Sequence, residues 1–185
     1  MDTTSKVYSG GDSWMKRKFS ALKPYIDIAR PDHWFKNVFM LPGLLLALAL
    51  GATLPENYMW VFLTGLVSVC LIASANYTIN EWLDAEFDRH HPVKKNRPSV
   101  SGAIKPEFVA LQWLVLSMLG IYLSYLIKIE FLMANVALLV MGVLYNVKPI
   151  RTKDRVYIDV LSEAINNPLR FLLGWYLVIA CLLYT

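Results

Sequence analysis

The sequence predicts an all-α fold, a polytopic bundle of transmembrane helices with about five spans. Of its 185 residues, 56% are hydrophobic and only 17% are charged, whereas an ordinary soluble domain has about 25% charged residues. The mean hydropathy is +0.43, and the apolar residues fall in runs of nearly transmembrane length. Both cysteines lie inside such runs. The composition therefore excludes a soluble globular domain, a disordered chain and a disulfide-stapled fold.

Residues 1–36 form a polar and basic leader, which we expect to be a unit separate from the membrane bundle. Apolar residues such as Trp14, Phe19 and Leu22 recur near helical spacing, with basic residues between them. This pattern over 14–28 predicts an amphipathic helix that lies on an anionic membrane surface. The leader lacks the long apolar core and the cleavage site of a secretory signal.

Residues 37–185 contain the apolar runs and are predicted to form the transmembrane catalytic bundle. Each run is near the minimum length for crossing a bilayer, about 20 residues. The last run ends without a polar cap or a basic flank, so we expect the bundle to be truncated at its C-terminus. The five runs cover residues 37–53, 59–79, 108–127, 131–147 and 168–185.

Basic residues are concentrated in alternate connections between these runs. The eighteen lysines and arginines include seven in the leader, five in 80–105 and four in 148–155. The connections after the first and third runs together carry only Lys128. The positive-inside rule therefore places the N-terminus and the segments 80–105 and 148–155 on the cytoplasmic side of the membrane. The same distribution explains the pI near 9.0 without a nucleic-acid partner.

A column of oxygen-bearing side chains is predicted where the second run passes into its cytoplasmic connection. Asn80, Asp84 and Asp88 are spaced four residues apart, which places them on one face of a helix, and Glu81 lies beside them. Like charges at this spacing destabilise a helix unless a cation compensates them. Mg²⁺ prefers such oxygen ligands together with substrate phosphates. The alternative is that the acids pair with neighbouring cations, namely Arg89, Lys94, Lys95 and Arg97.

Two basic segments on the same side suit a phosphorylated substrate, because ammonium and guanidinium groups neutralise a leaving group's charge. The first contains Lys94 and Arg97, and the second contains Lys148, Arg151 and Lys153. Orientation by the positive-inside rule is a second explanation, and both can hold. The polar residues Asn166 and Asn167 directly precede the last run, where either an interhelical hydrogen bond or a substrate contact would explain them.

These residues resemble motifs of the UbiA superfamily of membrane prenyltransferases. The segment 80–88 is similar to the family's first aspartate-rich motif, Asn-Asp-x-x-Asp-x-x-x-Asp, with Glu81 replacing its first aspartate. Arg97-Pro98-x-x-Ser101-Gly102 resembles the continuation of that motif. Tyr145, followed by the basic residues of 148–153, is similar to the family's tyrosine and basic loop.

The resemblance implies a helical bundle in which Mg²⁺ holds a polyprenyl diphosphate that ionises and alkylates an acceptor. The metal ligands implied are Asn80, Glu81, Asp84 and Asp88, and the catalytic residues are Asn80, Asp84, Asp88 and Tyr145. The diphosphate contacts implied are Lys94, Arg97, Lys148, Arg151 and Lys153. The family's second aspartate motif is expected beyond residue 185, so the resemblance implies half of the metal site here.

A narrower resemblance concerns the branch that transfers phosphoribose from phosphoribosyl diphosphate to polyprenyl phosphate. Arg30-Pro31-Asp32-His33-Trp34-Phe35-Lys36-Asn37 and the segment 88–98 resemble this branch, which implies substrate contacts by Arg30 and Lys36. The stretch 153–159 is closer to a general prenyltransferase, and we favour the broader assignment. A membrane scaffold or transporter is a third interpretation. The charges of a transporter would line the membrane midplane, whereas here the charges cluster at one face of the membrane. No oligomeric state follows from the sequence.

Overall fold

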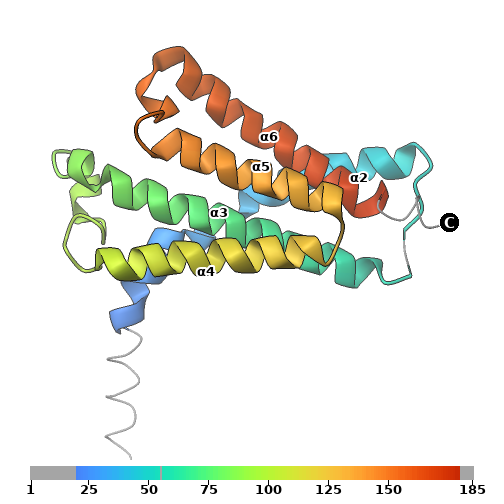
Figure 1. Ribbon diagram of the computed structural model, residues 1–185, viewed down its shortest axis with the longest axis horizontal. Helices are drawn as coiled ribbons and strands as arrows, with labels where there is room; N and C mark the ends of the chain where they lie inside the picture. The colour runs from blue at the N-terminus through green and yellow to red at the C-terminus, as the bar shows by residue number, and fades with distance from the viewer. Residues whose placement is uncertain (1–19, 55, 180–185) are drawn as a thin grey trace, which may run out of the picture.

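A computed structural model describes residues 20–54 and 56–179, and these residues form a bundle of helices without strands (Figure 1). The predicted all-α class is therefore confirmed for this part of the chain. Residues 20–29 form a first helical segment. The elements that follow are η1 (Pro31–Phe39), α2 (Met40–Ala49), α3 (Tyr58–Asp88), η2 (Lys94–Asn96), α4 (Pro106–Tyr125), α5 (Ile129–Asn146), η3 (Thr152–Asp154) and α6 (Val156–Ile179).

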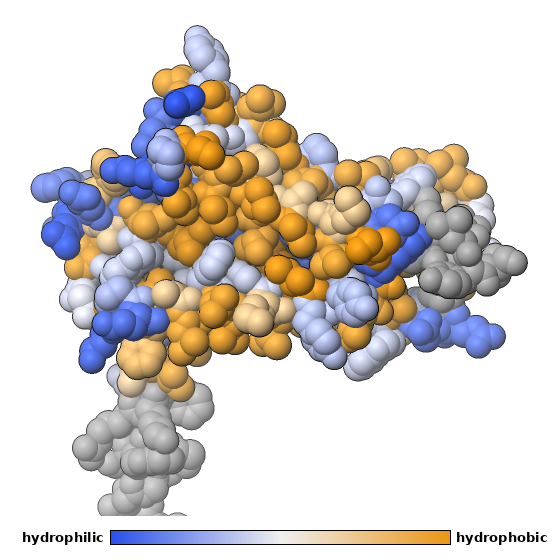
Figure 2. Space-filling view, in the orientation of Figure 1, coloured by the Kyte–Doolittle hydropathy of each residue, from blue (hydrophilic) through white to orange (hydrophobic). Residues whose placement is uncertain are grey.

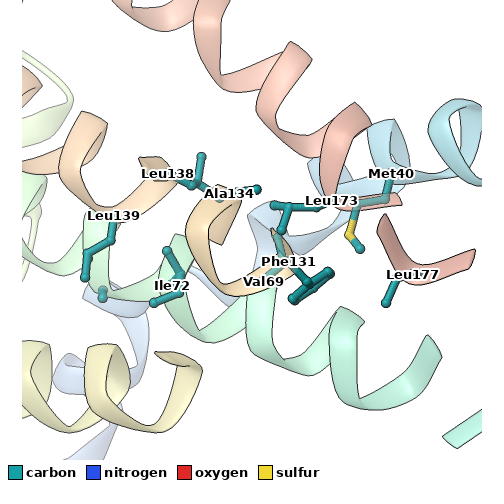
Figure 3. Packing of buried hydrophobic residues seen from close by; sticks show 10 residues of the cluster. Met40, Val69, Ile72, Phe131, Ala134, Leu138, Leu139, Leu173 and Leu177 are labelled. Carbon is teal, nitrogen blue, oxygen red and sulfur yellow. The ribbon is translucent and has the colours of Figure 1, made fainter. Parts of the chain in front are cut away.

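The helices pack as two groups that share one core. Helix α3 packs against α4 and α5, whereas α2 packs against α6, and α5 joins the groups through its contact with α6. Figure 3 shows the buried residues where they meet, with Phe131 of α5 next to Val69 of α3 and Leu173 of α6. These three side chains have no solvent exposure. The core thus holds α3, α5 and α6 together, and the polar motifs lie further along these helices, toward the C-terminal ends of α3 and α5.

Two glycines allow α2 and α6 to approach closely. A Cβ atom on Gly174 would lie 1.8 Å from the carbonyl oxygen of Met40, and one on Gly43 would lie 1.9 Å from that of Phe171. No side chain fits at such distances, because even a methyl group would overlap the backbone of the other helix. Close backbone approach through small residues is a common way to pack helices in membranes.

Three helices, α3, α4 and α5, are long and apolar enough to cross a membrane. The predicted run 37–53 is divided between η1, the ten-residue α2 and a turn at Gly51, whose φ is +96°. The predicted run 168–185 begins inside α6, and its residues 180–185 lie outside the described part. Of the predicted surface helix 14–28, residues 14–19 also lie outside it, and residues 20–28 are helical.

The basic connections gather at one end of the bundle, as predicted. The loops 89–105 and 147–155 lie at the left end in Figure 1 together with the segment 20–29, and residues 50–54, 56–57 and 126–128 lie at the right end. Figure 2 shows a hydrophobic band over the helices between these ends, with hydrophilic residues at both. Such a band matches a protein surrounded by lipid.

Candidate functional site

The site is built around the C-terminal part of α3, where the column of polar residues meets the loop that follows α5. Asp84 accepts a hydrogen bond from the Nη2 of Arg151 at 3.0 Å and one from the Nζ of Lys153 at 2.6 Å. The Nε of Arg151 also binds Asp154 at 3.0 Å. Arg151 and Lys153, which follow Asp84 by 67 and 69 positions in the sequence, therefore both bind its carboxylate.

The ammonium group of Lys153 lies in a cage of oxygen atoms. It donates to Asp84, to the Oδ1 of Asn146 at 2.7 Å and to the Oδ1 of Asn80 at 3.1 Å. Burial lowers the pKa of Lys153 below its ordinary value, whereas the adjacent Asp84 carboxylate raises it. Three oxygen ligands from α3 and α5 thus surround a positive charge at the cytoplasm-facing end predicted for the bundle.

The other acids of the column have different partners. Asp88 binds the Nη1 of Arg97 at 2.6 Å and the Nζ of Lys94 at 3.6 Å. Glu81 is 5% exposed and accepts a hydrogen bond from Ser99 at 3.4 Å. Because Glu81 is one residue on from Asn80, it is rotated by about 100° around the helix. The structure therefore separates Glu81 from the Asn80 and Asp84 oxygens that surround Lys153.

A polar cavity of about 490 Å³ opens beside the oxygen cage. Asn80, Asn146 and Tyr145 form part of its wall from α3 and α5. The Tyr145 hydroxyl donates to Asp159 at 2.8 Å, and the Lys153 ammonium lies 5.7 Å from the centre of the tyrosine ring. Tyr145 is thus placed between the cavity and the basic loop.

A second part of the cavity wall comes from η1 and α6. Arg30, which precedes η1, and Lys36 within it both line the cavity, and so do Asn166, Asn167 and Arg170 of α6. Arg170 is 8% exposed, and its Nε donates to Asn37 at 3.1 Å. Sequence analysis predicted Arg30 and Lys36 as substrate contacts and did not single out Arg170.

Of the predicted site residues, Arg30, Lys36, Asn80 and Tyr145 line the cavity, and the others do not. Lys94 and Arg97 reach the site through Asp88, and Lys148 is exposed without a hydrogen bond or ion pair to another described residue. Sequence analysis also missed Asn146, whose position directly after Tyr145 was the available indication. For Arg170 the indication was a cation inside an apolar run, where charges are usually functional.

The donors of the cage suit a hard divalent cation, because carboxylate and amide oxygens are its preferred protein ligands. The Lys153 ammonium already marks one position where three such oxygens, from Asn80, Asp84 and Asn146, converge on a positive charge. Among the described residues, no group of three or more acids, histidines or cysteines is arranged to hold a metal by itself. Bound phosphates and water would have to complete the coordination.

The profile of the UbiA prenyltransferase family matches residues 38–182. The chain belongs to this family. Its three apolar helices and this membership identify an integral membrane protein.

Similar proteins of several activities are found. The chain is 34% identical over 119 residues to decaprenyl-phosphate phosphoribosyltransferase of Mycolicibacterium smegmatis, covering 61% of this chain and 34% of that protein. It is 28% identical over 153 residues to digeranylgeranylglyceryl phosphate synthase of Methanosphaera stadtmanae, covering 83% and 52%. The chain therefore spans about a third to a half of these relatives.

A solved structure of a UbiA homolog from Archaeoglobus fulgidus, bound to DMAPP and Mg²⁺, has a similar fold. The TM-score is 0.69 at 24% identity, and the match covers 83% of this chain and 54% of that one. The predicted UbiA-like bundle is confirmed by this likeness.

Proposed function

We propose that this chain takes part in Mg²⁺-dependent transfer of a polyprenyl group from a polyprenyl diphosphate to an acceptor. The observation that carries the proposal is the oxygen cage of Asn80, Asp84 and Asn146, which borders the polar cavity and is flanked by Arg151. Oxygen ligands next to basic groups suit a metal-bound diphosphate. The family and the hydrophobic band support a substrate that enters from the lipid.

The proposed metal ligands are Asn80, Asp84 and Asp88, with Asn146 as a further oxygen donor, and Glu81 is the weakest of the predicted ligands because it binds Ser99. When bound, Mg²⁺ would neutralise charge on the diphosphate and favour its departure. Lys153 and Arg151 would exchange part of their contact with Asp84 for diphosphate oxygens. The Asp84 carboxylate would thereby become available to the metal.

The chain's own residues supply the remaining steps. Arg151 and Lys153, with Arg97 and Lys94 beyond them, stabilise the negative charge that grows on the leaving diphosphate. The Tyr145 ring borders the cavity, where its electron-rich face can stabilise an allylic cation.

The test is a transfer assay with the chain in lipid nanodiscs, Mg²⁺ and radiolabelled polyprenyl diphosphate. We expect label to reach an acceptor, with no transfer after chelation of the metal and a loss of about 10²–10³-fold in Asp84→Asn. Glu86→Gln is the matched control, because Glu86 lies on the same helix, is exposed and has no hydrogen bond or ion pair to another described residue. Normal turnover in Asp84→Asn would refute the assignment of the site.

A second candidate is transfer of phosphoribose from phosphoribosyl diphosphate to polyprenyl phosphate. It is supported by the relatives named decaprenyl-phosphate phosphoribosyltransferase, at 34% and 38% identity, and by the position of Arg30 and Lys36 on the cavity wall. Offering labelled phosphoribosyl diphosphate and a polyprenyl phosphate in the same assay separates the two reactions. Turnover with neither donor would favour the scaffold or transporter interpretation.

We also propose that the end carrying the cage faces the cytoplasm. The support is the concentration of basic residues in 80–105 and 148–155. With the two native cysteines replaced by alanine, Lys95→Cys at this exposed position should react with a membrane-impermeant maleimide only when the cytoplasmic face is accessible. Labelling from the opposite face of sealed vesicles would reverse the orientation.

A further inference from the structure

The wall formed by η1 and α6 contains a guanidinium group without a counter-ion. Arg170 is 8% exposed and lines the polar cavity. Its hydrogen bonds go to neutral oxygens, the Asn37 side chain at 3.1 Å and the Asn166 carbonyl at 3.4 Å. In the part of the chain that the structure describes, no carboxylate lies within 4.0 Å of it.

Arg30 adds a second unpaired guanidinium to this wall. It lies before η1 with a φ of 50°, in the left-handed region, and its guanidinium carbon is 5.9 Å from the centre of the Tyr77 ring. Its Nη2 donates to the Nε2 of His33 at 2.8 Å. The Oδ2 of Asp32 is 3.3 Å from the same nitrogen, but a guanidinium can only donate, so Nε2 accepts and the ring proton is on Nδ1.

The His33 Nδ1 is buried and has no hydrogen-bond partner among the described residues. Together with the guanidinium groups of Arg30 and Arg170, it makes this wall rich in donors. Lys36 also lines the cavity, and Glu163 is the one acid among the described lining residues. The described lining of this wall therefore carries three cations, Arg30, Lys36 and Arg170, against the single acid Glu163, which leaves an excess of positive charge.

An uncompensated charge is costly to bury, and in a membrane protein it usually marks a ligand site. The cations next to the wall from α3 and α5 are different, because Arg151 and Lys153 are paired with Asp84. An anion that binds near Arg170 thus meets free donors, whereas one near Asp84 must displace a carboxylate or share its cations. The cavity has room for two separate anionic groups at about 490 Å³.

We propose that Arg30 and Arg170 bind a phosphate monoester group, at a position separate from the diphosphate at Asp84. Guanidinium groups match phosphate oxygens because their donors form a planar fork, and two of them with Lys36 balance a doubly charged group. The phosphate belongs either to an isoprenyl phosphate that enters from the lipid or to a sugar phosphate that enters from water. This proposal rests on the proposed function in one respect only, namely that the cavity is the chamber in which the substrates bind.

The test is equilibrium binding to the full chain in nanodiscs of neutral lipid, without Mg²⁺ and without a diphosphate. Farnesyl phosphate is the probe for a lipid-borne phosphate, and ribose 5-phosphate is the probe for a sugar-borne one. We expect one of them to bind, and Arg170→Gln and Arg30→Gln to weaken it at least ~10-fold, as expected for loss of a charged hydrogen bond. Lys95→Gln, which removes an exposed cation outside the cavity, is expected to bind normally.

The probe that binds more tightly identifies the source of the phosphate. Failure of both probes to bind the native chain, or equal binding by the native chain and both glutamine variants, would overturn the proposal. Asp84→Asn separates this inference from the proposed function, since we expect it to lose transfer and to keep phosphate binding. Loss of phosphate binding in Asp84→Asn would instead mean that the two anions bind at one position, and it would overturn the proposal.

Folding of the variants is checked by thermal unfolding without a ligand. Because Arg170→Gln removes an uncompensated charge and can keep the hydrogen bond to Asn37, we expect its midpoint to be unchanged or higher. Arg170→Lys keeps the charge and serves as the second variant, with binding expected between those of the native chain and the glutamine variant. Binding by Arg170→Lys as weak as that of Arg170→Gln, with Arg30→Gln unaffected, would also overturn the proposal.

Discussion

The cations on the two sides of the cavity are of the same kinds but differ in their electrostatic state. Next to the wall from α3 and α5, Asp84 holds Arg151 and Lys153 at 3.0 and 2.6 Å. On the wall from η1 and α6, Arg170 is held by neutral oxygens, and no described carboxylate pairs with it. The first wall is neutralised in the free protein, and the second is not.

This difference separates two ways of handling an anionic substrate. A paired cation is available to a diphosphate only if its carboxylate gains another partner, and a divalent cation is such a partner. An unpaired cation can bind an anion directly, without a metal. Binding at the Asp84 wall should therefore depend on the metal, and binding at the Arg170 wall should not.

The strongest way to break this contrast is to remove the carboxylate of Asp84. Asp84→Asn keeps the size of the side chain but leaves Lys153 and Arg151 without their shared anion. We expect transfer to fall by about 10²–10³-fold, as for loss of a principal electrostatic group in an active site. Initial rates at saturating Mg²⁺ measure the effect. A loss smaller than tenfold would mean that Asp84 does not hold the metal.

The second prediction concerns the same ion pair, but it removes the cation, the Lys153 ammonium that occupies the oxygen cage. In Lys153→Gln, a cation no longer competes for the oxygens of Asn80, Asp84 and Asn146. We expect tighter Mg²⁺ binding, by about tenfold, together with slower transfer, because one contact to the diphosphate is lost. Titration of Mg²⁺ without substrate gives the affinity. Weaker metal binding would show that the ammonium helps to organise the cage.

Glu81 sharpens the contrast, because it belongs to the predicted metal ligands but binds Ser99. We expect Glu81→Gln to change transfer by less than about threefold and to leave the Mg²⁺ dependence unaltered, since a buried amide can keep the hydrogen bond at a cost of about 1 kcal/mol. The comparison variant is Asp88→Asn, for which we expect a much larger loss. Equal losses of transfer in the two variants would mean that Glu81 is a metal ligand.

The smallest expected effect concerns His33 on the unpaired wall. Burial, and then the Arg30 guanidinium, lower the pKa of His33 below its ordinary value of 6.5, against the opposite effect of Asp32. As the pH falls through 6.5, the unfolded chain binds more protons at this residue than the folded chain does. Protonation of His33 therefore lowers the free energy of unfolding below pH 6.5 and has no effect well above it.

Thermal unfolding of the native chain and of His33→Gln, measured between about pH 8 and pH 5, isolates this term. The native midpoint should decrease more than that of the variant as the pH falls below 6.5. A steeper decrease in the variant would mean that His33 gains stability from its proton, for example through Asp32, and that the wall is less positive than we infer.

Much of this site follows from local sequence. The spacing of Asn80, Asp84 and Asp88 fixes their common helix face, because the helical period is the same in any fold. The basic composition of 148–155 likewise predicts a phosphate-binding loop, and its return to the same end of the bundle follows from alternating spans. These predictions depend only on helical geometry and on the polarity of the membrane.

Other features depend on contacts between distant residues. Glu81 is near the column in sequence, yet the fold buries it against Ser99, and no pattern in 80–88 distinguishes it from a ligand. Lys148 resembles Lys153 in its setting, yet it lies exposed while Lys153 enters the cage. The direction in which a loop side chain points depends on the backbone path between α5 and α6, which short-range patterns do not encode.

By itself, the sequence determined the helical class, the clustering of the basic loops at one end and the face that carries the acids. These properties arise from apolar periodicity and from the cost of charge in lipid, which act on each segment separately. Only the tertiary structure decided which cations are paired. The contact of Asp84 with Lys153 and the isolation of Arg170 from carboxylates depend on how α3, α5 and α6 meet around one cavity.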